Sequence, residues 1–214
     1  MARPPSSPSL KNTKMIIIET PLTVQTYLEL FANGCPENLR PVECPYCKAI
    51  RELHRHGHYK RMVFTLEETY SIPIFRFKCP MCDKTTGLLP PFIGENEQTA
   101  WEVQEEVVRR QTTEGQSLIR VAGELAAAGG PYSEKSLWRW TTRWNRFLRD
   151  SGYMFWTQLL RILPHLQLPT GKMKPRAEWG WVFKIWDQVK AKFEDEGLFN
   201  WLYRQQKSMA LAPG

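Results

Sequence analysis

The sequence has no long apolar run, and this absence limits what the chain can be. Purely apolar stretches such as Met15–Ile18 cover about one turn of helix, whereas a membrane-spanning helix needs about 20 apolar residues. Residues 1–14 carry Pro4, Pro5 and Pro8 among serines and lack the apolar segment of a secretory signal. We therefore expect a cytoplasmic protein with no membrane partner, whose residues 1–14 form a disordered basic tail.

Cysteine is also scarce, with five residues in a chain of 214. Four of the five fall in two Cys-x-x-Cys pairs, a pattern that favours a metal site over disulfides in a reducing cytosol. Acidic residues are outnumbered, because 29 lysines and arginines face 22 aspartates and glutamates and leave a net charge of +7. This balance favours polyanionic partners, although many soluble proteins are equally basic without binding one.

Hydrophobic spacing predicts an α+β fold, a small β zinc ribbon followed by a mostly helical region. We expect a strand at 15–19 and a short helix through Val24 and Phe31, then three short strands near 51–56, 59–66 and 70–78. Turns are expected at Gly57 and at 67–68. Pro73 places the third strand at a sheet edge, because proline cannot donate a ladder hydrogen bond.

Helical spacing dominates the rest of the chain. We expect helices at 99–110, 117–128, 133–149 and 178–193, an apolar stretch at 155–163 and a loop at 169–175. The predicted divisions are a tail at 1–14, a strand and helix at 15–39, the zinc ribbon at 40–92, a helix-turn-helix region at 95–150 and an aromatic-rich helical region at 151–214.

The two cysteine pairs are the strongest signal in the chain. Cys44-Pro45-Tyr46-Cys47 and Cys79-Pro80-Met81-Cys82 share one form, and each lies beside a predicted strand. A Cys-x-x-Cys turn presents two thiolates to one ion, so the four cysteines complete a tetrahedron around a structural Zn²⁺. The alternatives are a redox dithiol or two chance pairs.

His54, His56 and His58 lie between the pairs. Four thiolates already satisfy zinc, so we expect these histidines to line a polar face rather than to bind the ion. With Arg55, Lys60 and Arg61 beside them, that face is suited to contact phosphate. Cys35 is expected to be a lone thiol.

The segment from 117 to 149 favours a helix-turn-helix. Small residues in 122–128 allow a second helix to approach, Gly129-Gly130-Pro131 supplies a turn, and Ser133 suits the N-cap of the next helix. The polar side of that helix carries the predicted DNA-contacting residues, Lys135, Ser136, Arg139, Thr142, Arg143, Arg146 and Arg149. Lys135, Ser136 and Arg139 are the leading candidates for base contact. The alternative is that this stripe is only a solvated face.

Several motifs together are similar to a known group. They are the Cys-Pro-x-Cys pairs, His54-x-His56-Gly57-x-Tyr59-x-Arg61, Arg76-Phe77 before the second pair, and Leu89-Pro90 with Phe92. The sequence resembles the zinc-binding N-terminal region of bacterial transposases, and more closely a family of uncharacterised bacterial mobile-element proteins with this ribbon and a helix-turn-helix. The resemblance covers about residues 40–150. It implies binding to element ends or operators, with Cys44, Cys47, Cys79 and Cys82 as zinc ligands.

The chain departs from full transposases after Asp150, where only 64 residues follow. A ribonuclease-H-like catalytic domain needs more chain and three separated acidic residues. Asp187 and Glu194–Glu196 cluster on or after one helix, so we expect no enzymatic activity. Aromatic residues from Trp179 to Tyr203 favour core packing or a homodimer seam over base stacking. Lys172, Lys174 and Arg176 in the loop before them are candidates for phosphate contact.

The sequence therefore predicts sequence-specific binding to double-stranded DNA by a cytoplasmic, nucleoid-associated protein. The expected role is that of a mobile-element regulator or an accessory of recombination or transposition. The alternative is a protein-interaction module that docks a recombinase, a transposase or another partner without binding DNA.

Overall fold

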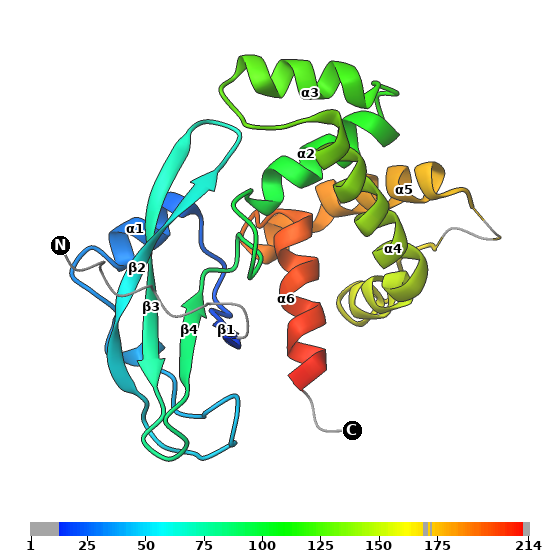
Figure 1. The fold of residues 1–214 in the computed structure, drawn as a ribbon. Helices are drawn as coiled ribbons and strands as arrows, with labels where there is room; N and C mark the ends of the chain where they lie inside the picture. The colour runs from blue at the N-terminus through cyan, green and yellow to red at the C-terminus, as the bar shows by residue number, and fades with distance from the viewer. Residues whose placement is uncertain (1–12, 169–170, 172, 212–214) are drawn as a thin grey trace. The chain divides into compact units, whose positions relative to one another are not determined.

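The computed structural model describes residues 13–168, 171 and 173–211, so nearly all of the predicted tail lies outside the described residues. The fold is mixed α+β, as expected from the sequence (Figure 1). Its elements are β1 (Met15–Ile17), α1 (Val24–Leu30), η1 (Glu37–Leu39), β2 (His54–Phe64), β3 (Thr69–Lys78), β4 (Thr85–Leu89), α2 (Trp101–Thr112), α3 (Leu118–Ala127), α4 (Glu134–Ile162), α5 (Pro175–Val189), η2 (Lys190–Phe193) and α6 (Leu198–Leu211).

The chain divides into two compact units, which we name by their content. The sheet unit is Met1–Arg61 with Ser71–Pro90, and the helical unit is Met62–Tyr70 with Pro91–Gly214. The tip of the β2–β3 hairpin is therefore grouped with the helices. There the Phe64 N–H donates to the Gln98 carbonyl, and the Ala100 N–H donates to the Phe64 carbonyl. None of the described helices is long and apolar enough to cross a membrane.

The sheet has four strands in the order β1-β4-β3-β2. β1 pairs in parallel with β4, with Met15 opposite Gly87, and β3 pairs antiparallel to β4, with Arg76 opposite Gly87. The expected turn at 67–68 is confirmed, because Thr65 and Glu68 close it with a backbone hydrogen bond of 3.0 Å. β4 itself was missed, since Thr85–Leu89 follows the second cysteine pair too closely to stand out as a separate strand.

Two details of the predicted strands were wrong. Gly57 does not end a strand: β2 runs through it, because glycine accepts the left-handed backbone (φ 77°) found there. Pro73 does not place β3 at the edge, since β3 lies between β4 and β2. β3 pairs with β4 through Arg76–Lys78, and Pro73 lies three residues before this stretch.

The core of the sheet unit is built on α1 and β3. Ile72, Ile74 and Phe77 of β3 are almost completely buried. The Tyr27 ring of α1 stacks on Phe31 at 4.3 Å, and its hydroxyl donates to the Pro73 carbonyl at 2.6 Å. Burial raises the pKa of the Tyr27 hydroxyl well above its usual range. The predicted N-terminal strand and helix thus complete the same core as β3.

In the helical unit, α4 is longer than the sequence predicted. Instead of ending at Arg149 it continues to Ile162 and includes the apolar stretch that had been treated as separate. Gly152 lies inside this helix and does not end it. A Cβ at this position would lie 3.2 Å from the Leu148 side chain of the same helix and at an ordinary contact distance of 3.7 Å from Glu178 Oε1 of α5.

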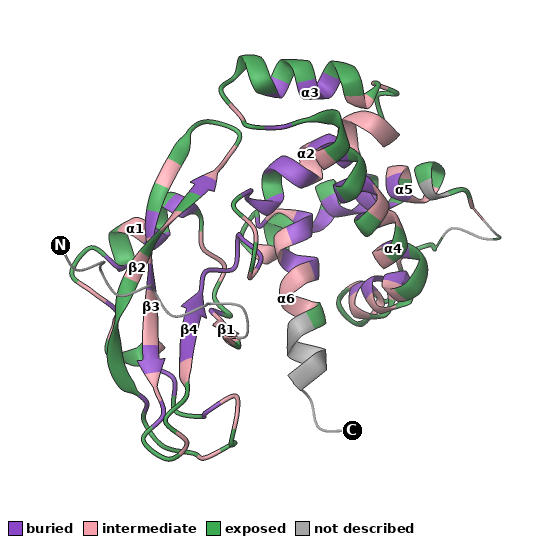
Figure 2. Cartoon of the chain, in the orientation of Figure 1, coloured by how far each residue is buried: buried purple, intermediate pink, exposed green. Residues whose placement is uncertain are grey.

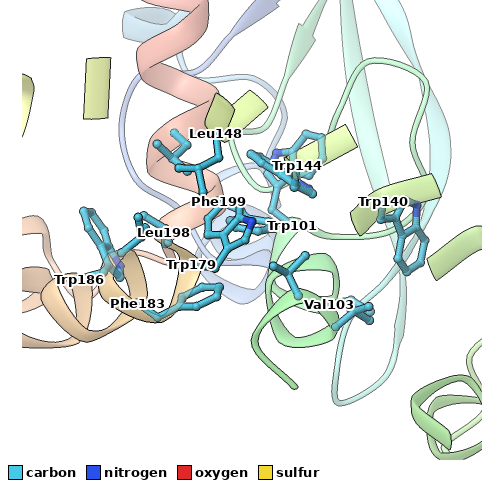
Figure 3. Close-up of a cluster of buried hydrophobic side chains, with 14 of the residues drawn as sticks. Trp101, Val103, Trp140, Trp144, Leu148, Trp179, Phe183, Trp186, Leu198 and Phe199 are labelled. Carbon is cyan, nitrogen blue, oxygen red and sulfur yellow. The ribbon is translucent and has the colours of Figure 1, made fainter. Parts of the chain in front are cut away.

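The aromatic residues of the C-terminal region form the core of the helical unit, as the sequence favoured (Figures 2 and 3). Trp179 and Phe199 are fully buried, and the Phe199 ring stacks on Trp144 at 3.8 Å. Because these rings are enclosed, they are not available to stack on bases. Residues 198–211 form a further helix, α6, which the sequence analysis did not predict.

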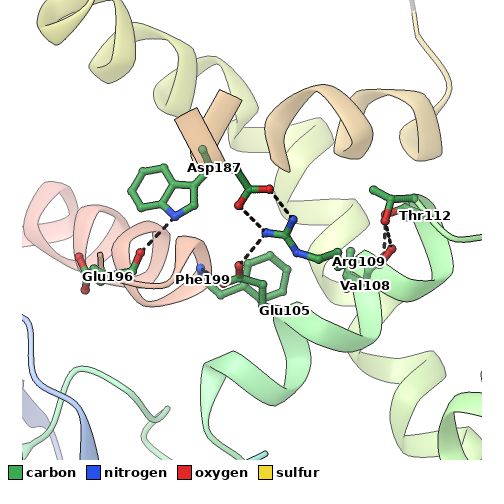
Figure 4. Close-up of polar contacts among 9 residues, drawn as sticks. Glu105, Val108, Arg109, Thr112, Asp187, Glu196 and Phe199 are labelled. Carbon is green, nitrogen blue, oxygen red and sulfur yellow. Dashed lines mark hydrogen bonds and ion pairs between the residues drawn. The ribbon is translucent and has the colours of Figure 1, made fainter. Parts of the chain in front are cut away.

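Hydrogen bonds and ion pairs of charged residues connect the helices at the edge of this core (Figure 4). Arg109 of α2 forms hydrogen bonds to both carboxylate oxygens of Asp187, at 2.7 and 3.1 Å. Glu105 Oε2 accepts from the Phe199 backbone N–H at 3.0 Å, and burial raises the pKa of the Glu105 carboxyl. Glu196 pairs with Arg204. Asp187 and Glu196 are thus engaged in ion pairs with Arg109 and Arg204.

Candidate metal centre and nucleic-acid interface

Two matched turns carry the four cysteines. In each turn the first cysteine N–H donates to the carbonyl five residues on (Cys44 to Ala49, Cys79 to Lys84), at 3.1 and 2.9 Å. The backbone N–H of the residue four positions later (Lys48 and Asp83) donates to the carbonyl of that first cysteine, at 3.0 Å in both turns. Lys48 and Asp83, which follow the second cysteine of each pair, share a left-handed backbone with φ of 61°. The repeated Cys-Pro-x-Cys sequence therefore folds into two copies of one turn.

The turns bring the four sulfurs together, although 31 residues separate the pairs in the sequence. Cys44 Sγ lies 3.7 Å from Cys82 Sγ, Cys47 Sγ lies 3.8 Å from Cys79 Sγ, and all four lie within 4.8 Å of one another. Among the described residues this is the one group of histidine, cysteine and acidic side chains positioned to hold a metal ion.

Electrostatics within the cluster favour ionisation of one thiol first. Burial raises the pKa of Cys44, but hydrogen bonds from the Cys47 and Tyr46 backbone and from neighbouring thiols outweigh it and lower this pKa to about 7. A hydrogen bond from the Lys84 backbone lowers the pKa of Cys82, but burial and the three nearby thiols raise it overall. Four sulfurs this close resist full ionisation unless a cation neutralises them.

Tyr46 links the first turn to the starts of β1 and β4, which lie at the same end of the sheet because the two strands are parallel. Its hydroxyl accepts from the Lys14 backbone N–H at 2.7 Å and donates to the Thr85 carbonyl at 3.3 Å. The ammonium groups of Lys14 and Lys84 lie over its ring at 5.4 and 5.1 Å. The cluster is thus held by the entry to β1 and the entry to β4 as well as by its own turns.

The three histidines and Cys35 lie outside this cluster. His54, His56 and His58 are exposed on β2, and the His58 ring lies 5.3 Å from Phe75. Cys35 is buried after α1, and burial raises the pKa of its thiol. The geometry agrees with the expectation that only the four paired cysteines belong to the metal site.

In the helical unit, α3 packs on both α2 and α4 through Val121, Ala122 and Leu125. Gly129 takes a left-handed backbone (φ 87°), and a Cβ on Gly130 would lie only 2.3 Å from the Tyr132 ring. Ser133 caps α4 as predicted, because its hydroxyl accepts from the Ser136 N–H at 3.3 Å. The Gly-Gly turn is therefore needed for α4 to begin where it does.

The predicted DNA-contacting residues of α4 fall into two groups. Lys135, Arg139 and Arg146 are exposed and form no ion pair with any residue that the structure describes. Ser136 and Thr142 are half-buried at the edge of the same face. Together these side chains leave a positive stripe on the solvent side of α4, opposite the buried Trp140 and Trp144.

The remaining two cations have partners inside the unit. Arg143 donates to Glu97 Oε1 and to Gln104 Oε1, both at 2.5 Å, and its guanidinium lies over the Trp101 ring at 5.6 Å. Arg149 donates to Asp150 at 3.0 Å. Arg143 thus belongs to the junction between α2 and α4, so its charge is largely used within the protein.

The sequence analysis overlooked Trp138. Its side chain is 57% exposed on the first turns of α4, beside the stripe of Lys135, Arg139 and Thr142. Helical spacing alone could have found it, since residue 138 lies three positions after 135 and four before 142. Of the loop cations, Lys172 lies outside the described residues, and Arg176 donates to the Thr112 carbonyl at 3.0 Å.

Comparison with known proteins adds one similarity. Residues 44–140 match the model of a family described as a domain of unknown function, DUF6431. No curated protein and no solved structure matches the chain. The matched range begins at Cys44, the first thiol of the cluster, and ends at Trp140 on α4. The chain is therefore similar to this family over all four cysteines, the α3–α4 pair up to that point and the sheet between them.

Proposed function

We propose that this protein binds double-stranded DNA in a sequence-specific manner, with a zinc-stabilised ribbon in the sheet unit and a helix-turn-helix formed by α3 and α4. One observation carries the proposal: Lys135, Arg139 and Arg146 form an exposed, uncompensated positive stripe on a helix that a second helix supports. Such a helix meets the needs of major-groove binding, where cations reach phosphates and Arg or Ser side chains reach base edges.

The geometry of the cysteine cluster supports zinc as its metal. A tetrahedral ion with Zn–S bonds of about 2.3 Å places its sulfurs about 3.8 Å apart, and the two measured separations are 3.7 and 3.8 Å. Four thiolates leave no position for substrate or water, so the ion has a structural role. Iron is the other metal that suits four sulfurs, and its absorption in the visible region distinguishes it from colourless zinc.

The proposed roles of the α4 side chains follow from their positions along the helix. Lys135, Ser136 and Arg139 lie in its first turns, the part of a recognition helix that enters the groove most deeply. Arg146 and Arg149 lie further along and suit phosphate contacts, which fix orientation without reading sequence. The resemblance to transposase N-terminal regions supports a role in recognising mobile-element DNA, as a regulator or as an accessory to a recombinase. No catalytic step is part of the proposal.

The test begins by selecting bound sequences from a random duplex library with the zinc-loaded chain. Arg139→Ala should then weaken binding to the selected site by about 1–3 kcal/mol and reduce the preference over random DNA. Arg161→Ala is the matched control, because Arg161 is exposed on the last turn of the same helix. Equal binding of selected and random DNA by wild type and Arg139→Ala alike would refute the assignment of α4 as the reading helix.

A second function is favoured by the exposed aromatic side chains. Trp138 is 57% and Tyr153 70% exposed on α4, and exposed aromatic residues are frequent anchors of protein interfaces. In this alternative the chain docks a recombinase or another protein and binds no DNA. Absence of binding to any duplex at low salt, together with a stable protein complex that Trp138→Ala disrupts, would favour it.

A further inference from the structure

We infer that β2 is a second DNA-binding element, which contacts the phosphate backbone of duplex DNA independently of α4. The inference adds to the proposed function a site in the other unit of the chain. It concerns the segment His54–Arg61, which we name the basic strand segment. Six of its eight residues are histidine, lysine or arginine.

The basic strand segment is open to solvent. His54, Arg55, His56, His58 and Lys60 are all exposed, whereas Tyr59 and Arg61 are half-buried. β2 is an outer strand of the sheet and pairs within it with β3 alone. A ligand can therefore approach both the side chains and the free edge of this strand.

The positive charge of the segment is only partly balanced. Arg55 forms an ion pair with Glu37 at 3.2 Å, whereas Lys60 forms none with any described residue. On the neighbouring strand the Arg76 guanidinium lies beside Gly57, and its Nε is buried without a hydrogen-bond partner in the described structure. Neither β2 nor β3 contains an acidic residue. The two strands thus contribute cations and histidines but no acid of their own, and Glu37 is the acid that pairs with Arg55.

Protection of an exposed edge explains part of this composition. Charged side chains on outer strands prevent pairing with other chains, and Arg55 and Lys60 suffice for that purpose. The three histidines are not needed for this protection. An imidazole N–H group can, however, donate to a phosphate oxygen, as arginine and lysine do.

Charge complementarity identifies the occupant. The segment offers several donors in a row and no large exposed apolar side chain, whereas a protein partner would need an apolar anchor. Duplex DNA offers a regular line of phosphates and would release counterions on contact. Phosphate contacts carry no sequence information, so β2 should contribute affinity equally for every sequence.

The experiment compares two charge-matched variants of the zinc-loaded full chain. The strand variant, Arg55→Gln with Lys60→Gln, removes two cations from β2. The control, Lys190→Gln with Lys192→Gln, removes two exposed cations from η2. Each is titrated with the selected duplex and with a random-sequence duplex of equal length, over a range of salt. Metal content and circular dichroism report whether each variant is folded.

We expect the strand variant to bind both duplexes about tenfold more weakly at 0.1 M salt, with a salt slope smaller by about 2. The control should match wild type. The double variant His54→Gln with His56→Gln should weaken binding to the two duplexes by the same factor, which should be smaller than tenfold.

Three results would overturn the inference: wild-type affinity and salt slope in the strand variant, an equal loss in the control, or a loss confined to the selected duplex. Failure of the proposed function is separate. If wild type binds both duplexes equally, the proposal that α4 reads the DNA sequence fails. The comparison of wild type with the strand variant on the random duplex still tests whether β2 contacts DNA.

Discussion

The sheet unit and the helical unit are stabilised by different means. The helical unit buries six tryptophans, Trp101, Trp140, Trp144, Trp179, Trp186 and Trp201, in one continuous core. The sheet unit buries mainly aliphatic side chains and three aromatic rings, those of Tyr27, Phe31 and Phe77. It adds four cysteines at the end of the sheet where the chain turns between strands. We therefore expect the small sheet unit to depend on a bound metal for its stability more than the helical unit, which has the larger apolar core.

The two units also differ in how they use charge. In the helical unit, Arg109 and Arg143 form ion pairs with Asp187 and Glu97, whereas Arg139 is exposed and forms no ion pair with any residue that the structure describes. In the sheet unit, Arg55, Lys60 and Arg61 lie on one outer strand, and Lys60 forms no ion pair with any described residue. A cation's function therefore depends on its neighbours in space, and each of the following experiments tests one side of this comparison.

The largest effect is expected from removing a metal ligand. Cys47→Ser with Cys82→Ser should abolish metal binding and unfold the sheet unit, because structural zinc contributes about 10–16 kcal/mol in small metal-dependent domains. The helical unit should keep its helical signal and its buried tryptophan emission. Hydrogen exchange by mass spectrometry checks this by locating the loss of protection in 13–61 and 71–90.

Cys35→Ser serves as the control for that experiment, since Cys35 lies outside the cluster. It should retain one metal ion per chain. Loss of protection throughout the chain in the double variant would show instead that the helical unit depends on the metal.

The next largest effect concerns the aromatic core. Phe199 is fully buried and stacks on Trp144, so Phe199→Ala should lower the free energy of unfolding of the helical unit by about 3–5 kcal/mol. Metal stoichiometry should be unchanged. Urea titration followed by tryptophan emission measures the loss, and Phe199→Leu should retain most of the stability.

A smaller effect separates Arg143 from Arg139. Arg143→Ala removes the contacts to Glu97 and Gln104 and should cost about 1–2 kcal/mol of stability, with little change in DNA preference. Arg139→Ala should do the reverse, because Arg139 is exposed and forms no ion pair in the described structure. Thermal unfolding and DNA titration of both variants provide the test. Equal effects on stability would contradict the division of the stripe into two groups.

The smallest effect is a change in pH dependence. Burial raises the pKa of Glu105, so the folded protein binds this proton more tightly than the unfolded chain. Its contribution to stability is fully present below the ordinary glutamate pKa of about 4.3 and is lost as pH rises through the higher folded value.

Glu105→Gln removes this titration and leaves an acceptor for the Phe199 N–H. Between pH 5 and 7.5, wild type should therefore lose more unfolding free energy than the variant as the pH rises. Urea unfolding of both proteins at both pH values is the measurement. An equal change in unfolding free energy in wild type and variant would exclude Glu105 as the source of the pH dependence.

The sequence predicted what depends on local spacing. The two Cys-Pro-x-Cys turns, the cap at Ser133 and the buried side of α4 all follow from residues a few positions apart. What it missed depends on distant neighbours. The role of Arg143 is set by Glu97 and Gln104 from the loop before α2 and from α2 itself, and helical periodicity carries no information about them. The place of β3 inside the sheet likewise depends on β4, which joins it from beyond the second cysteine pair.

The separation of the two cysteine turns also has a consequence for synthesis. The second pair is translated 35 residues after the first, as the positions of Cys47 and Cys82 show. At about 5–20 residues per second, Cys44 and Cys47 wait about 2 to 7 seconds for their partners. During this interval three thiols, those of Cys35, Cys44 and Cys47, are present on the nascent chain before Cys79 and Cys82 are added. We therefore expect this unit to respond to oxidants and to the supply of metal before α2–α6 have been translated.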